Sequence, residues 1–95
     1  MLEKDITNKI IKYLKTVPDM FCWKQHGGGP YSTAGLPDLI CCYKGRFIAF
    51  EVKTADGKLT KLQESTITKI KAAKVEAFKV ISIDEVREIL KNLNF

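Results

Sequence analysis

Residues 46–53 read RFIAFEVK, an apolar segment that ends in two charged residues. Its first five residues are typical of a buried β-strand. Because the side chains of a strand alternate between its two faces, Glu51 and Lys53 are predicted to point to the same side. Two charges on one side of an otherwise apolar strand require an explanation, and the neighbouring segments supply candidates for it.

The segments around this strand predict an order of elements for the whole chain of 95 residues, a length that fits one domain over residues 1–95. Helices are predicted at 2–15, at 60–74 and from 82 onward, and strands at 20–25, 38–43, 46–53 and 76–81. The motifs TKLQ (60–63) and SIDE (82–85) are capping boxes. The order α-β-β-β-α-β-α predicts an α/β fold, a mixed sheet with helices on its faces.

Composition restricts the class of protein. The net charge is +5 and the pI is near 9.2, which favours a polyanionic partner. No apolar run approaches the roughly 20 residues of a membrane span, and the N-terminus lacks the apolar core of a signal peptide. The three cysteines are predicted to be free thiols in a reducing cytoplasm. Cys41, Cys42 and Trp23 are expected in the core.

The register of the hairpin brings two acids together. If Lys44 and Gly45 form a two-residue turn, Tyr43 pairs with Arg46, and Asp38 lies directly opposite Glu51. Like charges at ~5 Å repel by about 3 kcal/mol at an effective dielectric near 20. A favourable cross-strand pair contributes only ~0.2–1 kcal/mol. A cation is therefore expected beside the two carboxylates.

Asp38 and Glu51 suit a hard divalent cation, because Mg²⁺ binds one or two carboxylates and completes its shell with water and phosphate oxygens. Lys53 is expected to stay charged next to two acids, so it is a candidate for holding a phosphate oxygen rather than for a general base. A water molecule activated by the cation is the better nucleophile. The alternative is a surface cluster of ion pairs at a strand end.

Glu3 is a further acid of interest. On a helical wheel it falls inside the apolar arc of the first helix, where a carboxylate would need a partner. The alternative is a first turn in which Glu3 complements the helix dipole.

The motifs GLPD (35–38) and EVK (51–53) resemble those of the PD-(D/E)xK nuclease superfamily. With Glu3 in the first helix and KLTKLQ (58–63) after a short loop, the chain resembles more narrowly a virus-type replication-repair nuclease (VRR-NUC) domain. The resemblance implies a restriction-endonuclease-like sheet with flanking helices and a phosphodiesterase dependent on Mg²⁺ or Mn²⁺.

The resemblance also implies roles for single residues. Asp38 and Glu51 would bind the metal, together with the carbonyl of Val52, and Lys53 would position water or phosphate. Gln63 would support the site and Glu3 would be the helix acid. Gln63 has an equally plausible role as the third residue of the capping box that begins at Thr60.

Candidate DNA contacts surround this set. The loop HGGGPYSTAG (26–35) offers backbone N–H groups around Gly28 to phosphates, and Tyr31 could stack on a base. The alternative is a flexible connector. Lys58 and Lys61 are candidates for binding DNA phosphates.

The resulting hypothesis is a structure-selective DNA endonuclease of a bacterial or phage-infected cytoplasm. It is expected to act as a homodimer on branched DNA such as four-way junctions, in DNA repair. The alternatives are a non-catalytic nucleic-acid-binding module, or a nuclease of the same fold that acts on flaps or ends.

Overall fold

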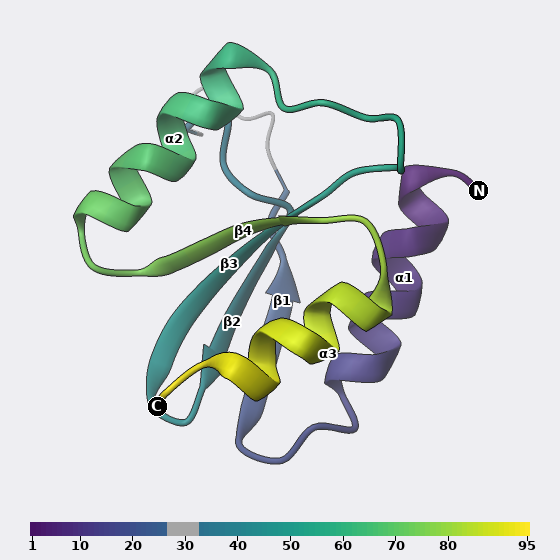
Figure 1. The fold of residues 1–95 in the computed structure, drawn as a ribbon, viewed down its shortest axis with the longest axis vertical. Helices are drawn as coiled ribbons and strands as arrows, with labels where there is room; N and C mark the ends of the chain where they lie inside the picture. The colour runs from purple at the N-terminus through teal and green to yellow at the C-terminus, as the bar shows by residue number, and fades with distance from the viewer. Residues whose placement is uncertain (27–32) are drawn as a thin grey trace.

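The computed structural model describes residues 1–26 and 33–95 and contains the predicted elements in the predicted order. In chain order they are α1 (Glu3–Leu14), β1 (Met20–Lys24), β2 (Leu39–Tyr43), β3 (Arg46–Val52), α2 (Lys61–Ala72), β4 (Glu76–Val80) and α3 (Ile83–Asn92) (Figure 1). Their ends differ from the predicted ones by one or two residues, within the usual fraying of element ends.

The four strands form a mixed sheet in the order β1-β2-β3-β4. The pairs β1·β2 and β2·β3 are antiparallel, and β3·β4 is parallel. A parallel neighbour needs a crossover connection, and α2 provides it between β3 and β4. This arrangement confirms the predicted α/β class with helices flanking a mixed sheet.

The β2–β3 hairpin has the predicted register, with Tyr43 opposite Arg46 and Leu39 opposite Phe50. Lys44 and Gly45 have φ values of 50° and 82°. Positive φ at both turn residues is the type I′ geometry, whose twist matches that of the flanking strands. The next position beyond Leu39 and Phe50 is occupied by Asp38 and Glu51.

Helices α1 and α3 cover one face of the sheet, here called the α1/α3 face (Figure 1). The helices contribute their apolar stripes to it, including Ile10, Leu14 and Val86, which are fully buried. The strands contribute the alternate side chains that point to this side. The buried strand residues of this core are Leu39, Cys41, Tyr43, Ile48, Phe50, Val52 and Val80.

Helix α2 covers the opposite face, here called the α2 face, and packs on a smaller cluster. Ile67 of α2 lies against Ala49 and Ala77, neighbours on β3 and β4. Small side chains on the strands allow the helix to approach the sheet closely. No helix of the described residues is long and apolar enough to cross a membrane.

Candidate active site

Glu51 is the buried acid of the site, with 2% of its surface exposed. It lies near the end of β3 on the α2 face, opposite Lys79 of β4. Desolvation by burial is the main cause that raises the pKa of its carboxyl to about 8, and the neighbouring Asp38 carboxyl raises it further. Its Oε2 atom is buried without a hydrogen-bond partner among the described residues. A polar atom in that position is costly unless something else binds it.

Asp38 lies directly before β2 and is joined to both neighbouring strands. Its Oδ2 accepts a hydrogen bond from the backbone N–H of Val52 at 2.9 Å. Its carbonyl oxygen accepts one from the backbone N–H of Gln25 at 2.7 Å. The hairpin alternates hydrogen-bonded and non-hydrogen-bonded pairs, and Asp38 opposite Glu51 falls in the latter class, in which side chains lie closer. The Asp38 carboxyl is near enough to Glu51 to raise the pKa of the Glu51 carboxyl.

Pro37 comes just before Asp38 and has no N–H to donate. If the register of β2 and β3 continues by two residues beyond Leu39 and Phe50, Pro37 stands opposite Val52. An ordinary residue there would donate its N–H to the Val52 carbonyl, but proline has no N–H. The Val52 N–H donates to the Asp38 side chain, so the main chain of Val52 lies directly beside one of the two acids.

Lys53 follows β3 directly and shares the side of Glu51. Its backbone N–H donates to the carbonyl of Val80 at 2.9 Å, which continues the parallel ladder by one residue. Gly57 then folds back over it in a turn closed by a hydrogen bond to the Thr54 carbonyl at 2.9 Å. A Cβ atom on Gly57 would lie 3.2 Å from the Cβ of Lys53, so the glycine permits this close approach. The Lys53 ammonium lowers the pKa of Glu51, against the larger effects that raise it.

Two solved structures share this arrangement of strands and helices. One, a VRR_NUC domain, is 18% identical, has a TM-score of 0.79, and covers 97% of this chain and 97% of its own. The other, a VRR_NUC domain protein, is 17% identical, has a TM-score of 0.73, and covers 96% of this chain and 86% of its own. The chain has the VRR-NUC fold. No family model matches the sequence, and no curated protein does.

Within the VRR-NUC fold, Gln63 forms the predicted capping box. Its Oε1 accepts a hydrogen bond from the Thr60 N–H at 3.0 Å, and its own N–H donates to Thr60 Oγ1 at 3.1 Å. The side chain is therefore committed to the start of α2 through its oxygen.

Glu3 is exposed in the first turn of α1, which agrees with the second of the two interpretations left open by the sequence, an acid of the first turn, and not with a carboxylate on the buried face. The apolar arc of the helix begins to be buried only at Ile6. In the first turn of the helix, the acid Glu3 complements the helix dipole.

Of the four predicted DNA contacts, two lie in the part of the chain that the structure describes. Lys58 and Lys61 are exposed, the first in the loop after β3 and the second at the start of α2. Gly28 and Tyr31 lie outside the described residues.

Gly35, the first residue of the GLPD motif, makes a close contact with α2. It has φ +78°, and a Cβ atom there would lie 2.7 Å from Leu62 Cγ and 2.9 Å from Thr66 Oγ1. The segment leading to Asp38 is thereby held against α2 of the VRR-NUC fold. Its place in the motif GLPD, three residues before the acid, was the available signal.

The residues present fit a divalent cation of the Mg²⁺ class. They offer two carboxylates and a neighbouring backbone carbonyl, all oxygen atoms, and Glu51 Oε2, which has no hydrogen-bond partner among the described residues, is an atom that such a cation would bind. In the described part of the chain there is no group of three or more His, Cys, Asp or Glu residues placed to hold a metal. This set suits a cation that keeps several waters, and it does not suit a closed zinc site.

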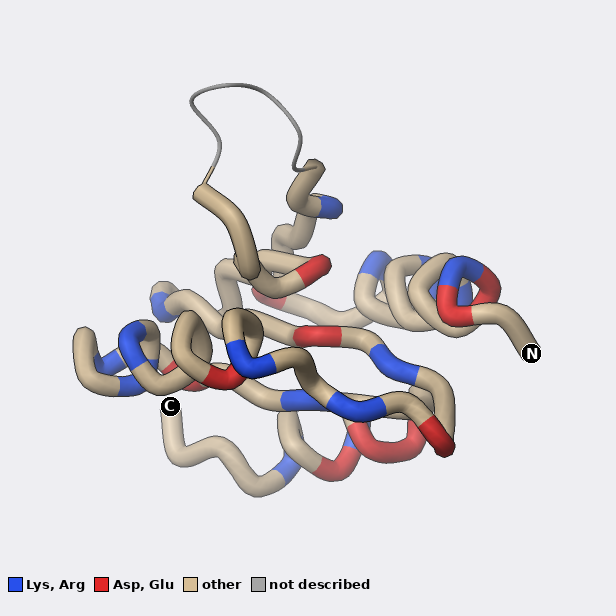
Figure 2. Tube along the Cα trace, turned by 90° about the horizontal axis from the view of Figure 1, so that it is seen from above, with Lys and Arg blue, Asp and Glu red and all other residues tan. Residues whose placement is uncertain are grey.

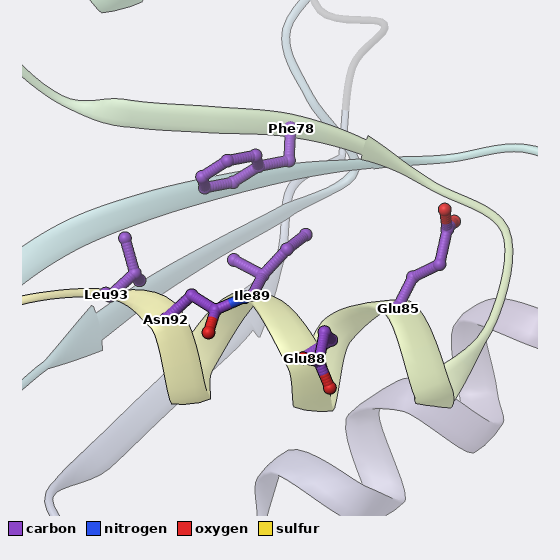
Figure 3. A pocket seen from close by; sticks show the side chains of 6 residues that line it. All are labelled: Phe78, Glu85, Glu88, Ile89, Asn92 and Leu93. Atoms are coloured by element: carbon purple, nitrogen blue, oxygen red, sulfur yellow. The ribbon is translucent and has the colours of Figure 1, made fainter.

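A separate pocket of about 440 Å³ lies between β4 and α3 (Figure 3). It is lined by Phe78, Ile89 and Leu93 together with polar side chains of α3. Phe78 pairs with Phe50 on the α1/α3 face, so this pocket opens on the opposite side of the sheet from Glu51. It is not part of the candidate active site.

Proposed function

We propose that this chain is a DNA endonuclease that hydrolyses phosphodiester bonds with the help of Mg²⁺ or Mn²⁺. The observation that carries the proposal is the Glu51 carboxyl, which is buried beside a second acid and has one oxygen without a hydrogen-bond partner among residues 1–26 and 33–95. Such an arrangement is unfavourable in the absence of a cation. It occurs on a VRR-NUC fold, at the position of the motif that resembles the nuclease signature.

Asp38, Glu51 and the Val52 carbonyl would hold the cation, which when bound polarises phosphate and lowers the pKa of water. Lys53 stands on the same side as Glu51, and its ammonium would stabilise negative charge that develops on the phosphate oxygens during hydrolysis. Gln63 and Gly35 act at a distance, because they set the start of α2 and the approach of the chain to Asp38. Lys58 and Lys61 would bind flanking phosphates.

The proposed substrate is branched DNA, cut by a homodimer in the cytoplasm of a bacterium or an infected host. Resolving a four-way junction needs two coordinated cuts, and the chain offers one Asp-Glu-Lys set. A two-fold dimer presents two identical sites in mirrored orientation. The net charge of +5 supports a polyanionic substrate.

A metal titration with labelled four-way, flap and linear DNAs tests the proposal. Cleavage is expected only with Mg²⁺ or Mn²⁺, and chelation should abolish it. Calorimetry should show metal binding that Glu51→Ala loses. Unchanged metal affinity in Glu51→Ala would contradict the proposed centre. Metal-independent DNA binding with no product would favour a non-catalytic binding module instead.

Lys53→Met separates catalysis from binding. It is expected to keep metal binding and most DNA binding while cleavage falls by about 10²–10³-fold, the usual loss when one stabiliser of transition-state charge is removed. Lys79→Met is the matched control, because Lys79 lies opposite Glu51 on β4 but is exposed. A loss in Lys53→Met that is confined to DNA affinity would make Lys53 an ordinary phosphate contact.

A further inference from the structure

Two aromatic side chains of β1 are exposed to solvent on the α2 face, which also carries Asp38 and Glu51. Phe21 is 68% exposed and Trp23 is 38% exposed. Trp23 pairs with Ile40, which in turn pairs with Ala49, so its ring is on the α2 face with Glu51. The two rings are neighbours, with centroids 5.9 Å apart and planes tilted by 42°. Trp23 is thus outside the core in which sequence analysis expected it.

The aromatic pair is adjacent to the row of the sheet that holds the acids. Gln25 pairs with Asp38, which faces Glu51, and Trp23 is two residues before Gln25 on the same strand. Two residues of a strand span about 7 Å, and neighbouring strands are about 5 Å apart. Trp23 is therefore about 8–12 Å from the acids, which corresponds to about two to four nucleotides at a stacked rise of 3.4 Å.

The polar N–H group of the Trp23 indole is already hydrogen-bonded. Its Nε1–H donates to the side-chain oxygen of Gln25 at 3.4 Å, which directs the ring along the strand towards the acids. With the N–H occupied, what remains free is the π-face of the ring. An aromatic face binds any base by stacking, because every base has a π-face.

The charge of this side of the molecule matches a nucleic acid. Figure 2 shows Lys and Arg along α2, whereas Asp and Glu gather on α3 beyond the other face of the sheet. Helix α2 carries Lys61, Lys69 and Lys71 against a single acid, Glu64. A polyanion is thus favoured on the face that carries Phe21 and Trp23.

The exposed aromatic area is small for a protein partner. With about 200 Å² for a whole aromatic side chain, the exposed parts of Phe21, Trp23 and Phe47 amount to roughly 300 Å². A standard protein interface buries about 800 Å² on each partner. One or two stacked bases need far less, so bases suit this surface better than a second protein does.

We propose that Phe21 and Trp23 form a stacking platform for unpaired bases next to the scissile phosphate. The proposal rests on the proposed nuclease function and narrows its substrate to DNA with unpaired nucleotides beside the cut, as at flaps, frayed junction centres and bulges. The platform selects such DNA because bases inside an intact duplex cannot reach the rings.

The single tryptophan of the chain makes the platform directly observable. In EDTA, a short single-stranded oligothymidylate is expected to quench the fluorescence of Trp23, and a flap duplex with an unpaired arm should do the same. A blunt duplex of equal length should quench much less. Equal quenching by the blunt duplex would overturn the proposal.

Variants test the same point by anisotropy of a labelled flap. Phe21→Ala/Trp23→Ala is expected to weaken binding of the flap by roughly 10-fold or more, in line with the contribution of base–aromatic stacking, and to leave blunt-duplex binding unchanged. Phe47→Ala is the matched control, because Phe47 is a 53% exposed aromatic on the same face, two strands away from β1. An equal loss in Phe47→Ala would contradict a specific platform.

Two further readouts separate this proposal from its alternatives. Light scattering of Phe21→Ala/Trp23→Ala should give the same mass as the parent, whereas a drop from dimer to monomer would show that the rings contact a second copy and would overturn the platform. Quenching that persists in Glu51→Ala would support the platform even if cleavage failed. Normal flap cleavage and flap affinity in Phe21→Ala/Trp23→Ala would refute the platform and leave the metal centre standing.

Discussion

The two faces of the sheet use the same strands for different purposes. On the α1/α3 face, Leu39, Ile48 and Phe50 are fully buried in a continuous apolar core. On the α2 face, the same segments place a buried carboxyl with a partnerless oxygen and leave aromatic rings exposed. Apart from the pocket between β4 and α3, the first face is a closely packed apolar core, and the second face holds groups whose interactions are incomplete.

This difference shows how a small chain separates stability from chemistry. Alternation along β3 directs Ile48, Phe50 and Val52 to one side and Glu51 and Lys53 to the other. Adjacent residues can therefore carry unrelated tasks. Substitutions on the α1/α3 face should affect unfolding, and those on the α2 face should affect ligand binding and cleavage.

Of the substitutions considered, Phe50→Ala on the α1/α3 face should lower the free energy of unfolding most. Phe50 is fully buried and stacks on Phe78 with ring centroids 6.1 Å apart. We expect the free energy of unfolding to fall by about 3–5 kcal/mol, from lost burial and the cavity left behind. Urea denaturation measures it, with the exposed Phe47→Ala as the control, which should change stability by less than about 0.5 kcal/mol. Equal losses of unfolding free energy in Phe50→Ala and Phe47→Ala would contradict the view that the α1/α3 face contributes most of the stability.

The buried Glu51 carboxyl on the α2 face should make the stability of the protein depend on pH. The pKa of Glu51 is about 8 in the folded chain and near 4.5 when unfolded, so the folded state holds a proton that the unfolded state has lost between these values. The metal-free protein should therefore lose stability as pH rises from about 4.5 to about 8, by an amount on the order of a few kcal/mol.

Glu51→Gln should remove most of this dependence and raise the melting temperature of the metal-free protein at pH 8. Added Mg²⁺ should stabilise the parent at that pH and have no such effect on Glu51→Gln. The exposed strand residue Glu76 supplies the control variant Glu76→Gln, which should keep the slope of the parent. A parent whose stability is flat between pH 5 and 8 would show that Glu51 is ionised in the folded state without help.

The smallest expected effect concerns the cap of α2. Thr60→Ala removes the hydroxyl that accepts the Gln63 N–H and should lower the free energy of unfolding by about 1 kcal/mol. Gln63→Ala removes the reciprocal bond. If Gln63 acts only as a cap, the two variants should cleave DNA equally well when both are folded. A much larger loss of cleavage in Gln63→Ala would assign it a role at the reaction itself.

Local rules were sufficient for most of the architecture. Helical and strand periodicity predicted the order of elements, and the Lys44-Gly45 turn set the register that places Asp38 opposite Glu51. Capping motifs placed the starts of α2 and α3 to within a residue. These features depend on neighbours in the chain, so the amino-acid sequence determines them directly.

The remaining features depend on contacts between distant segments. Glu3 falls in an apolar arc of its helix, yet the packing of α1 leaves it exposed, and burial along this arc begins only at Ile6. Trp23 is a large aromatic residue of the kind expected in a core. Helix α2, however, packs on β3 and β4 and does not cover the side chain of Trp23 on β1.

By itself, the sequence determined which residues follow one another on each face, and with them the pair of acids and the adjacent lysine. Only the tertiary structure decided how deeply each group is buried. In the part of the chain that the structure describes, burial leaves Glu51 Oε2 without a hydrogen-bond partner, and the close contact of Gly35 with α2 holds the segment that carries Asp38. The physical reason is that the solvation of a side chain depends on which distant segments pack against it. A periodic pattern along the chain does not specify that packing.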